Sequence, residues 1–232
     1  MRRYLSWLKY FVSGSLAFFA VAEAKAETYS RTYPYSVQPL PGGLSNALTV
    51  NSNSPEIIQT EGILVSTFPK EGKLNPDAHL NTALSGKFDI FTHHIAVKEQ
   101  ANDTSTLFQG IVLQNATDKE ITLTIDSAST YTTGPDAPFL KLPDFVRNDE
   151  AKIYAGPGDR VSQDILREKS YFGDDKKQIK IAPNDFYLLM NDPIPVAEFS
   201  TRNGKTSLFK LESTGDVYVA DLAMYQKARS SK

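Results

Sequence analysis

The sequence predicts an all-β protein: an antiparallel β-sandwich with one short helix, following a cleaved N-terminal signal peptide. Residues 121–126 alternate between apolar and polar side chains, which is the period-two pattern of a half-buried strand. About eight to ten short segments of strand character follow one another, separated by Gly, Pro, Asn and Asp residues that favour turns. A helical period is found only near residues 159–169.

The first 26 residues have the features of a signal peptide. Basic residues precede an apolar run at 10–22, which is shorter than the roughly 20 residues that span a bilayer. Small residues at Ala24 and Ala26 then predict cleavage before Glu27. An uncleaved membrane anchor is the alternative. We therefore expect an exported protein, periplasmic or extracellular, with no stable membrane span after cleavage.

The rest of the chain divides into three predicted parts. Residues 27–55 are rich in Tyr, Pro, Ser and Asn, and their prolines interrupt ladder hydrogen bonding, which predicts an extended arm or edge piece. Residues 56–225 carry the strand patterns and are predicted to form the β-sandwich domain. Residues 226–232 are a polar tail.

The expected elements of the domain follow in chain order. Strands are predicted over 56–68, 87–97, 107–114, 121–133, 178–181, 186–190, 206–211 and 217–225. The polar residues 115–119 predict that the strands on either side form an antiparallel hairpin, and 213–216 predict a second turn. The helix is predicted to be capped by Asp159 or Ser162 and to end near Lys169.

Charge and composition exclude several classes of function. Loss of residues 1–26 removes four positive charges and one negative charge, which takes the net charge from −2 to −5. An acidic surface repels phosphate backbones, so we expect no nucleic-acid partner. The chain has no cysteine, which excludes disulfides, thiol catalysis and iron–sulfur clusters. No motif indicates a cofactor.

The histidines are the candidate metal ligands. His93 and His94 are adjacent, with Asp89 upstream, and a histidine pair near a carboxylate is typical of zinc or copper sites. On a regular strand, however, neighbouring side chains point to opposite faces, so both could bind one ion only across a β-bulge. The favoured interpretation is that they are hydrogen-bonded residues of a sheet. The alternative is a metal site that combines His79 with His93.

Four residues are candidate binding residues: Tyr131, Asp136, Phe139 and Arg160. They lie in or beside loops expected at one end of the sandwich, where an aromatic side chain offers a rigid face. The backbone amides at the start of the predicted helix, together with Arg160, could also hold an anion. The alternative is that these aromatics cover the edge of the core and that 156–160 form only a turn and a helix cap.

Five motifs carry a resemblance to known proteins: NSNSPEIIQTEGILVSTFP at 51–69, GKFDIFTHHIA at 86–96, PDAPF at 135–139, GPGDRVSQDIL at 156–166 and GKTSLFKLESTGDVYVADLAMY at 204–225. The chain resembles a family of secreted cyanobacterial proteins classified as a domain of unknown function. The resemblance implies an exported protein and supplies no activity or catalytic residue. Family members continue beyond the last strand, which implies that this chain is a short or truncated member.

Two functions are compatible with these observations. The favoured one is a non-catalytic binding or structural component of the cell envelope or extracellular matrix, with a glycan or an envelope protein as its partner. The alternative is an enzyme, either a carbohydrate-active or a metal-dependent hydrolase. A bulge near Thr92 that brought His79 and either His93 or His94 together with a carboxylate would favour the enzyme. A regular strand there, with tyrosines gathered on one exposed surface, would favour the binding component.

Overall fold

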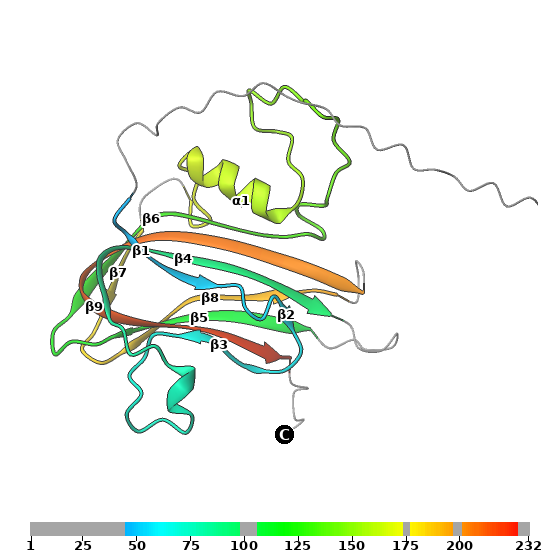
Figure 1. The fold of residues 1–232 in the computed structure, drawn as a ribbon. Coiled ribbons are helices and arrows are strands. Elements are labelled where there is room, and N and C mark those ends of the chain that lie inside the picture. The colour runs from blue at the N-terminus through cyan, green and yellow to red at the C-terminus, as the bar shows by residue number, and fades with distance from the viewer. Residues whose placement is uncertain (1–44, 98–105, 174–176, 197–200, 227–232) are drawn as a thin grey trace, which may run out of the picture. The chain divides into compact units, whose positions relative to one another are not determined.

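Strand β9 (Arg202–Tyr225) pairs with four other strands and connects the two layers of the fold. Its first half pairs with β4 (Leu84–Val97) and β6 (Ile121–Thr132). Its second half pairs with β3 (Gly62–Ser66) and β5 (Leu107–Asn115). In Figure 1, β9 accordingly starts in the layer of β4 and β6 and ends in the layer of β3 and β5. The two layers correspond to the predicted sandwich.

The structure is a computed structural model that describes residues 45–97, 106–173, 177–196 and 201–226. Within these residues nine strands form one sheet. The remaining elements are β1 (Leu48–Ser52), β2 (Ile57–Ile58), the short 3-10 helix η1 (Pro76–Ala78), α1 (Pro157–Leu166), β7 (Lys177–Ile181) and β8 (Phe186–Ile194). The prediction of an all-β fold with one short α-helix is confirmed. β1 and β2 run parallel to β4, however, so the sheet is mixed and not wholly antiparallel.

The predicted turn at 213–216 is wrong, because β9 continues through it as a bent strand. The partner of β9 changes from β6 at Ser213 to β5 at Val217, so the chain passes between the layers here. Gly215 lies at this bend, and a Cβ atom added to it would be 2.6 Å from Cγ2 of Ile121. Only glycine lets the two strands approach this closely.

The predicted hairpin between β5 and β6 is also wrong. β5 pairs with β8 and β9, whereas β6 pairs with β7 and β9, so the segment between them connects the two layers. Asn115, which is fully buried, fixes this connection: its Nδ2 donates hydrogen bonds to the carbonyl oxygens of Lys119, Ile181 and Ala182 at 2.6, 3.0 and 3.0 Å. Residues 115–119 therefore do turn the chain, but the turn connects the two layers and not two paired strands.

The hydrophobic core lies between the two layers. Alternate residues of β6 point into it, as the period of two predicts. Strands β1, β4, β5, β7, β8 and β9 also contribute buried side chains to this core. Its largest fully buried members are Phe88, Ile90, Ile111, Leu113, Leu123, Ile125, Phe209 and Leu211. This core holds β6 in place and thereby fixes the outward-facing side chains of the same strand.

Helix α1 packs on β6 and β9 and begins earlier than predicted. Gly156 is the N-cap residue, with φ of 87° and no side-chain cap, and Pro157 takes the first helical position. The prediction that Asp159 or Ser162 caps the helix is therefore wrong. Asp159 instead accepts a hydrogen bond from the backbone N–H of Ala155 at 2.9 Å.

The ends of the chain are only partly described. Strand β1, which falls within the predicted arm, is an edge strand that pairs with β4. The predicted signal peptide, the rest of the arm up to residue 44 and residues 227–232 lie outside the described residues. In the part of the chain that the structure describes, no helix is both long and apolar enough to cross a membrane.

Candidate functional site

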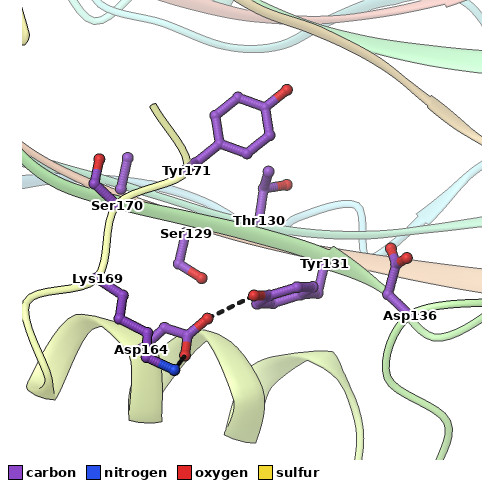
Figure 2. Close-up of a pocket in the computed structure, with 9 residues that line it drawn as sticks. Ser129, Thr130, Tyr131, Asp136, Asp164, Lys169, Ser170 and Tyr171 are labelled. Atoms are coloured by element: carbon purple, nitrogen blue, oxygen red, sulfur yellow. Dashed lines mark hydrogen bonds and ion pairs between the residues drawn. The ribbon is translucent and has the colours of Figure 1, made fainter. Parts of the chain in front are cut away.

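A groove lies along the edge of β6 next to α1, and we call it the β6 groove. Its volume is about 490 Å³. It is lined by Ala128, Ser129, Thr130, Tyr131, Asp136, Asp164, Lys169, Ser170 and Tyr171. Figure 2 shows Tyr131, Asp164 and Lys169 on the side of β6 that faces α1, with Tyr171 on the other side of the strand.

The groove exists because β7 covers only part of β6. The pairing with β7 ends at Ile125, and the register of β6 against β9 shifts between Ile125 and Ser127. Beyond this point, the edge of β6 forms one isolated parallel β-bridge, between Ala128 and Ser170. The segment that leaves α1 then turns away at 171–173, so the last residues of β6 border the groove.

Tyr131 and Asp164 form the central contact on the α1 side. The Tyr131 hydroxyl donates a 2.6 Å hydrogen bond to Oδ2 of Asp164, and Nζ of Lys169 lies 3.5 Å from Oδ1 of the same carboxylate. The pKa of Tyr131 is raised above its usual 10.0, chiefly by burial and then by its hydrogen bond to the negative Asp164, while the positive Arg160 opposes the shift. Tyr131 is therefore a protonated donor at neutral pH.

Arg160 stacks between two tyrosine rings. Its Cζ lies 3.9 Å from the centre of the Tyr131 ring and 4.9 Å from that of Tyr154. Its Nη1 donates hydrogen bonds to the backbone oxygen of Asp136 and to the Tyr154 hydroxyl. Cation–π stacking of this kind restricts both rings as well as the arginine. The Tyr131 ring is thus held in one orientation at the groove.

Asp136 closes the far end of the groove. Its Oδ2 accepts hydrogen bonds from the backbone N–H and the hydroxyl of Thr132, at 3.1 and 2.8 Å. The backbone N–H of Ala137 returns to the carbonyl oxygen of Thr132 at 3.0 Å. These bonds fold the loop after β6 back onto the strand, so the last residue of β6 has its outer backbone groups occupied.

Of the four candidate binding residues, the structure brings three together. Tyr131 and Asp136 line the β6 groove, and Arg160 contacts both of them. Phe139 is 72% exposed and does not line the groove; its ring lies against Gly156, where an added Cβ would clash with it. Phe139 therefore supports the start of α1.

The sequence did not indicate Asp164, Lys169 or Tyr171 as site residues. Asp164 could have been found, because it lies four residues after Arg160 and so one helical turn further along the same face. Lys169 and Tyr171 follow the helix in an irregular segment. Their position depends on the bridge at Ser170, for which the sequence carries no signal.

The candidate metal ligands lie at different places. His79 shares a 2.8 Å hydrogen bond with the Ser66 hydroxyl on β3, and Ser66 pairs with Ala220 of β9. His93 shares a 2.8 Å hydrogen bond with the hydroxyl of Thr206, which belongs to the opposite half of β9. Among the described residues, no group of three or more His, Cys, Asp or Glu side chains could hold a metal ion.

The strand that carries the two histidines is regular. β4 pairs with β9 in unbroken register from Gly86 to Val97, so His93 and His94 point to opposite faces. His93 faces outward, where its Nε2 lies 3.3 Å from Oε1 of Glu56. His94 faces inward and is fully buried.

His94 belongs to a buried network that superficially suggests a Ser-His-Asp triad. Its Nε2 lies 2.9 Å from the Ser52 hydroxyl and 3.2 Å from Oδ2 of Asp221, while its Nδ1 is 2.9 Å from the backbone oxygen of Pro55. A carbonyl oxygen only accepts, so Nδ1 carries a proton. Gln109 donates to both oxygens of Asp221. None of the His94, Gln109 and Asp221 side chains is exposed, so no substrate reaches them, and the network stabilises the fold.

Comparison with known proteins gives a family and no activity. A family model described as "Protein of unknown function (DUF3370)" matches residues 35–232, which include every described element. No curated protein matches the chain. No solved structure matches it.

Proposed function

We propose that this chain, which belongs to the DUF3370 family of proteins of unknown function, is an exported, non-catalytic binding component of the cell envelope or extracellular matrix. Its ligand in this proposal is a glycan, held in the β6 groove. The observation that carries the proposal is the gathering of Tyr131 and Tyr171 with two carboxylates and one ammonium group around a single groove.

The chemistry of the groove suits a sugar. A sugar ring presents apolar C–H faces and a rim of hydroxyl groups, and tyrosine offers both a flat apolar face and a polar tip. The carboxylates of Asp136 and Asp164 can accept hydrogen bonds from sugar hydroxyls, and Lys169 can donate one. A volume of about 490 Å³ falls in the range of small-molecule sites, roughly 300–1,000 Å³.

The proposed location depends on the N-terminal sequence. The basic residues, the short apolar run and the small residues before Glu27 are the features that secretory signal peptides share. The absence of cysteine from the whole sequence agrees with a protein that does not depend on the redox state of its compartment. These features support a periplasmic or extracellular position, where envelope glycans are the abundant ligands.

The hydrolase has less support from the same geometry. The regular register around Thr92 leaves His93 on the outer face, between Thr206 and Glu56. A hydroxyl, an imidazole and a carboxylate in series could form a catalytic set. Thr206 is only 1% exposed, however, so its hydroxyl is not accessible to a substrate. The arrangement is better explained as a polar contact that ties β4 to β9.

A co-sedimentation experiment tests the proposal. The purified protein is mixed with insoluble peptidoglycan and with envelope polysaccharide, and the bound fraction is measured as salt is increased. We expect retention that resists salt, because stacking on tyrosine depends little on ionic strength. Retention that disappears at high salt, or that does not exceed that of a control protein, would contradict glycan binding.

A matched pair of variants locates the site. Tyr171→Ala removes a half-exposed ring from the groove, whereas Phe145→Ala removes a ring that is 83% exposed and lies outside it. We expect Tyr171→Ala to lower retention several-fold and Phe145→Ala to leave it unchanged. Equal retention by both variants would show that the ligand binds elsewhere.

A further inference from the structure

Within the β6 groove, the backbone of Thr130 faces outward. The N–H of Thr133 donates to the carbonyl oxygen of Gly204 on β9, so odd-numbered residues at this end of β6 direct their backbone groups toward β9. Even-numbered residues direct theirs away from it. Two hydrogen bonds confirm this direction. The carbonyl oxygen of Ala128 accepts from the N–H of Tyr171 at 2.5 Å, and the N–H of Thr132 donates to the side chain of Asp136.

Thr130 is the one outward-facing position left open between two closed ones. Ala128 is occupied by the bridge to Ser170, and Thr132 is occupied by Asp136 and Ala137. Among the described residues, no partner is found for the backbone N–H or C=O of Thr130, whose hydroxyl is bonded inward to Ser207 at 2.8 Å. Thr130 lines the groove and these two groups point away from β9, so they lie on the side of β6 where a ligand would bind.

The ligand that complements one N–H and one C=O side by side is a secondary amide. In a sheet, this pair is satisfied by the amide of a neighbouring strand. A bound amide would accept from the Thr130 N–H and donate to its C=O. A buried edge group that stays unpaired is costly, so a ligand without an amide would lose affinity here.

We propose that the backbone of Thr130 recognises the acetamido group of an N-acetylated sugar. This inference rests on the proposed function, since it specifies the class of glycan for the same groove. A peptide strand offers the same amide chemistry but needs several consecutive open edge positions. The open stretch from Ala128 to Thr132 measures only about 13 Å at ~3.3 Å per residue, and both of its ends are closed. A pendant amide fits this opening, whereas an added strand would meet Ser170 and Asp136.

The residues around the opening fit a sugar that carries this group. Tyr131 and Tyr171 lie on opposite sides of β6, so each offers a surface to one side of a ligand centred at Thr130 (Figure 2). Asp164 and Lys169 lie on the Tyr131 side, within reach of ring hydroxyls. The amide contact would set the register of the sugar along the groove.

Two trisaccharides that differ at one position test the inference. The β-1,4-linked trimer of N-acetylglucosamine carries an acetamido group where the β-1,4-linked trimer of glucose carries a hydroxyl. We expect the acetylated trimer to bind about tenfold tighter or more by calorimetry, the effect of two amide hydrogen bonds. In amide NMR spectra of the protein it should shift the Thr130 resonance more than that of Tyr131, whose N–H faces β9.

A variant pair isolates the backbone donor. Thr130→Pro removes the outward N–H at a strand edge, where proline is tolerated, and Thr130→Val keeps the N–H while losing the hydroxyl. We expect Thr130→Pro to bind the acetylated trimer no better than the glucose trimer, and Thr130→Val to bind like the wild type. If Thr130→Pro does not fold, the NMR shifts of the wild-type protein decide.

The outcomes separate this inference from the proposed function. Equal affinity for both trimers would overturn the amide contact and leave glycan binding in place. No binding of either trimer, together with no retention on peptidoglycan or envelope polysaccharide, would overturn both. Tighter binding of an extended alanine tripeptide with blocked ends would overturn the choice of an acetamido sugar.

Discussion

Replacing Asp221 with asparagine tests whether the buried His94 network is structural. The Asp221 carboxylate accepts from Gln109 at 3.1 and 3.0 Å and lies 3.2 Å from Nε2 of His94, and none of the three side chains is exposed. Asparagine keeps the shape but places an NH₂ group where one acceptor was, so at least one buried N–H then faces another donor. Each unsatisfied buried donor costs about 1–3 kcal/mol. Together with loss of the charged partner of His94, we expect Asp221→Asn to lower the free energy of unfolding by about 3–5 kcal/mol.

Urea unfolding followed by far-ultraviolet circular dichroism measures this loss. For a domain of this size, the expected change corresponds to a fall in Tm of roughly 6–20 °C. Asp89→Asn is the matched control, because that carboxylate lies 3.8 Å from Nζ of Lys210 and both side chains are partly exposed; we expect about 1 kcal/mol or less. If Asp221→Asn loses no more than this control, the network does not hold the layers together, and a functional role for it would have to be considered.

Two further predictions concern the bend of β9 and the groove. Gly215→Ala should lower the free energy of unfolding by about 1–3 kcal/mol, because the new Cβ would lie 2.6 Å from Cγ2 of Ile121. Gly110→Ala is the control: its Cβ would be 3.7 Å from the nearest heavy atom, so the loss should be about 1 kcal/mol or less. Equal losses for the two variants would contradict the close approach of the strands at Gly215. The pKa of Tyr131 lies above its usual 10.0, so its contribution to stability is complete below pH 10 and is lost as the pH rises through the raised pKa. Asp164→Asn should bring this pKa back toward 10.0, as measured by phenolate absorbance with Tyr131→Phe as the reference, and an unchanged titration would refute the assigned hydrogen bond.

The sequence predicted strands well and their partners poorly. The alternation at Ile121, Leu123 and Ile125 identified the buried face of β6, because burial on one face imposes a period of two. The polar residues after Asn115 predict a turn, but the same pattern is expected whether the strands on either side pair as a hairpin or lie in different layers. What separates them is β9, whose 24 residues pair first with β6 and then with β5, so that the two strands lie in different layers. That choice depends on contacts between residues far apart in the chain.

The site was predicted in part for a similar reason. Aromatic and charged residues on loops suit binding, which predicts Tyr131, Asp136 and Arg160 as site residues, and the structure places these three together. Tyr171 follows α1 without any pattern of its own, and one backbone bridge at Ser170 brings it to the groove. The local sequence pattern predicts which side chains face outward, whereas contacts between residues far apart in the chain determine which of these side chains lie together in the groove.

The edges of the sheet explain why the opening at Thr130 is informative. Exposed strand edges invite association between chains, and proteins commonly block them with lysine, proline or covering segments. Here β7 carries the exposed Lys177 and Lys180, and β8 contains Pro193, so each of these edges has a recognised form of protection. The edge of β6 beyond β7 is covered by the bridge at Ser170 and by the loop at Asp136. The opening left between them is too short for a second strand but long enough for one amide, which is the geometry expected of a ligand site on an edge that is otherwise closed.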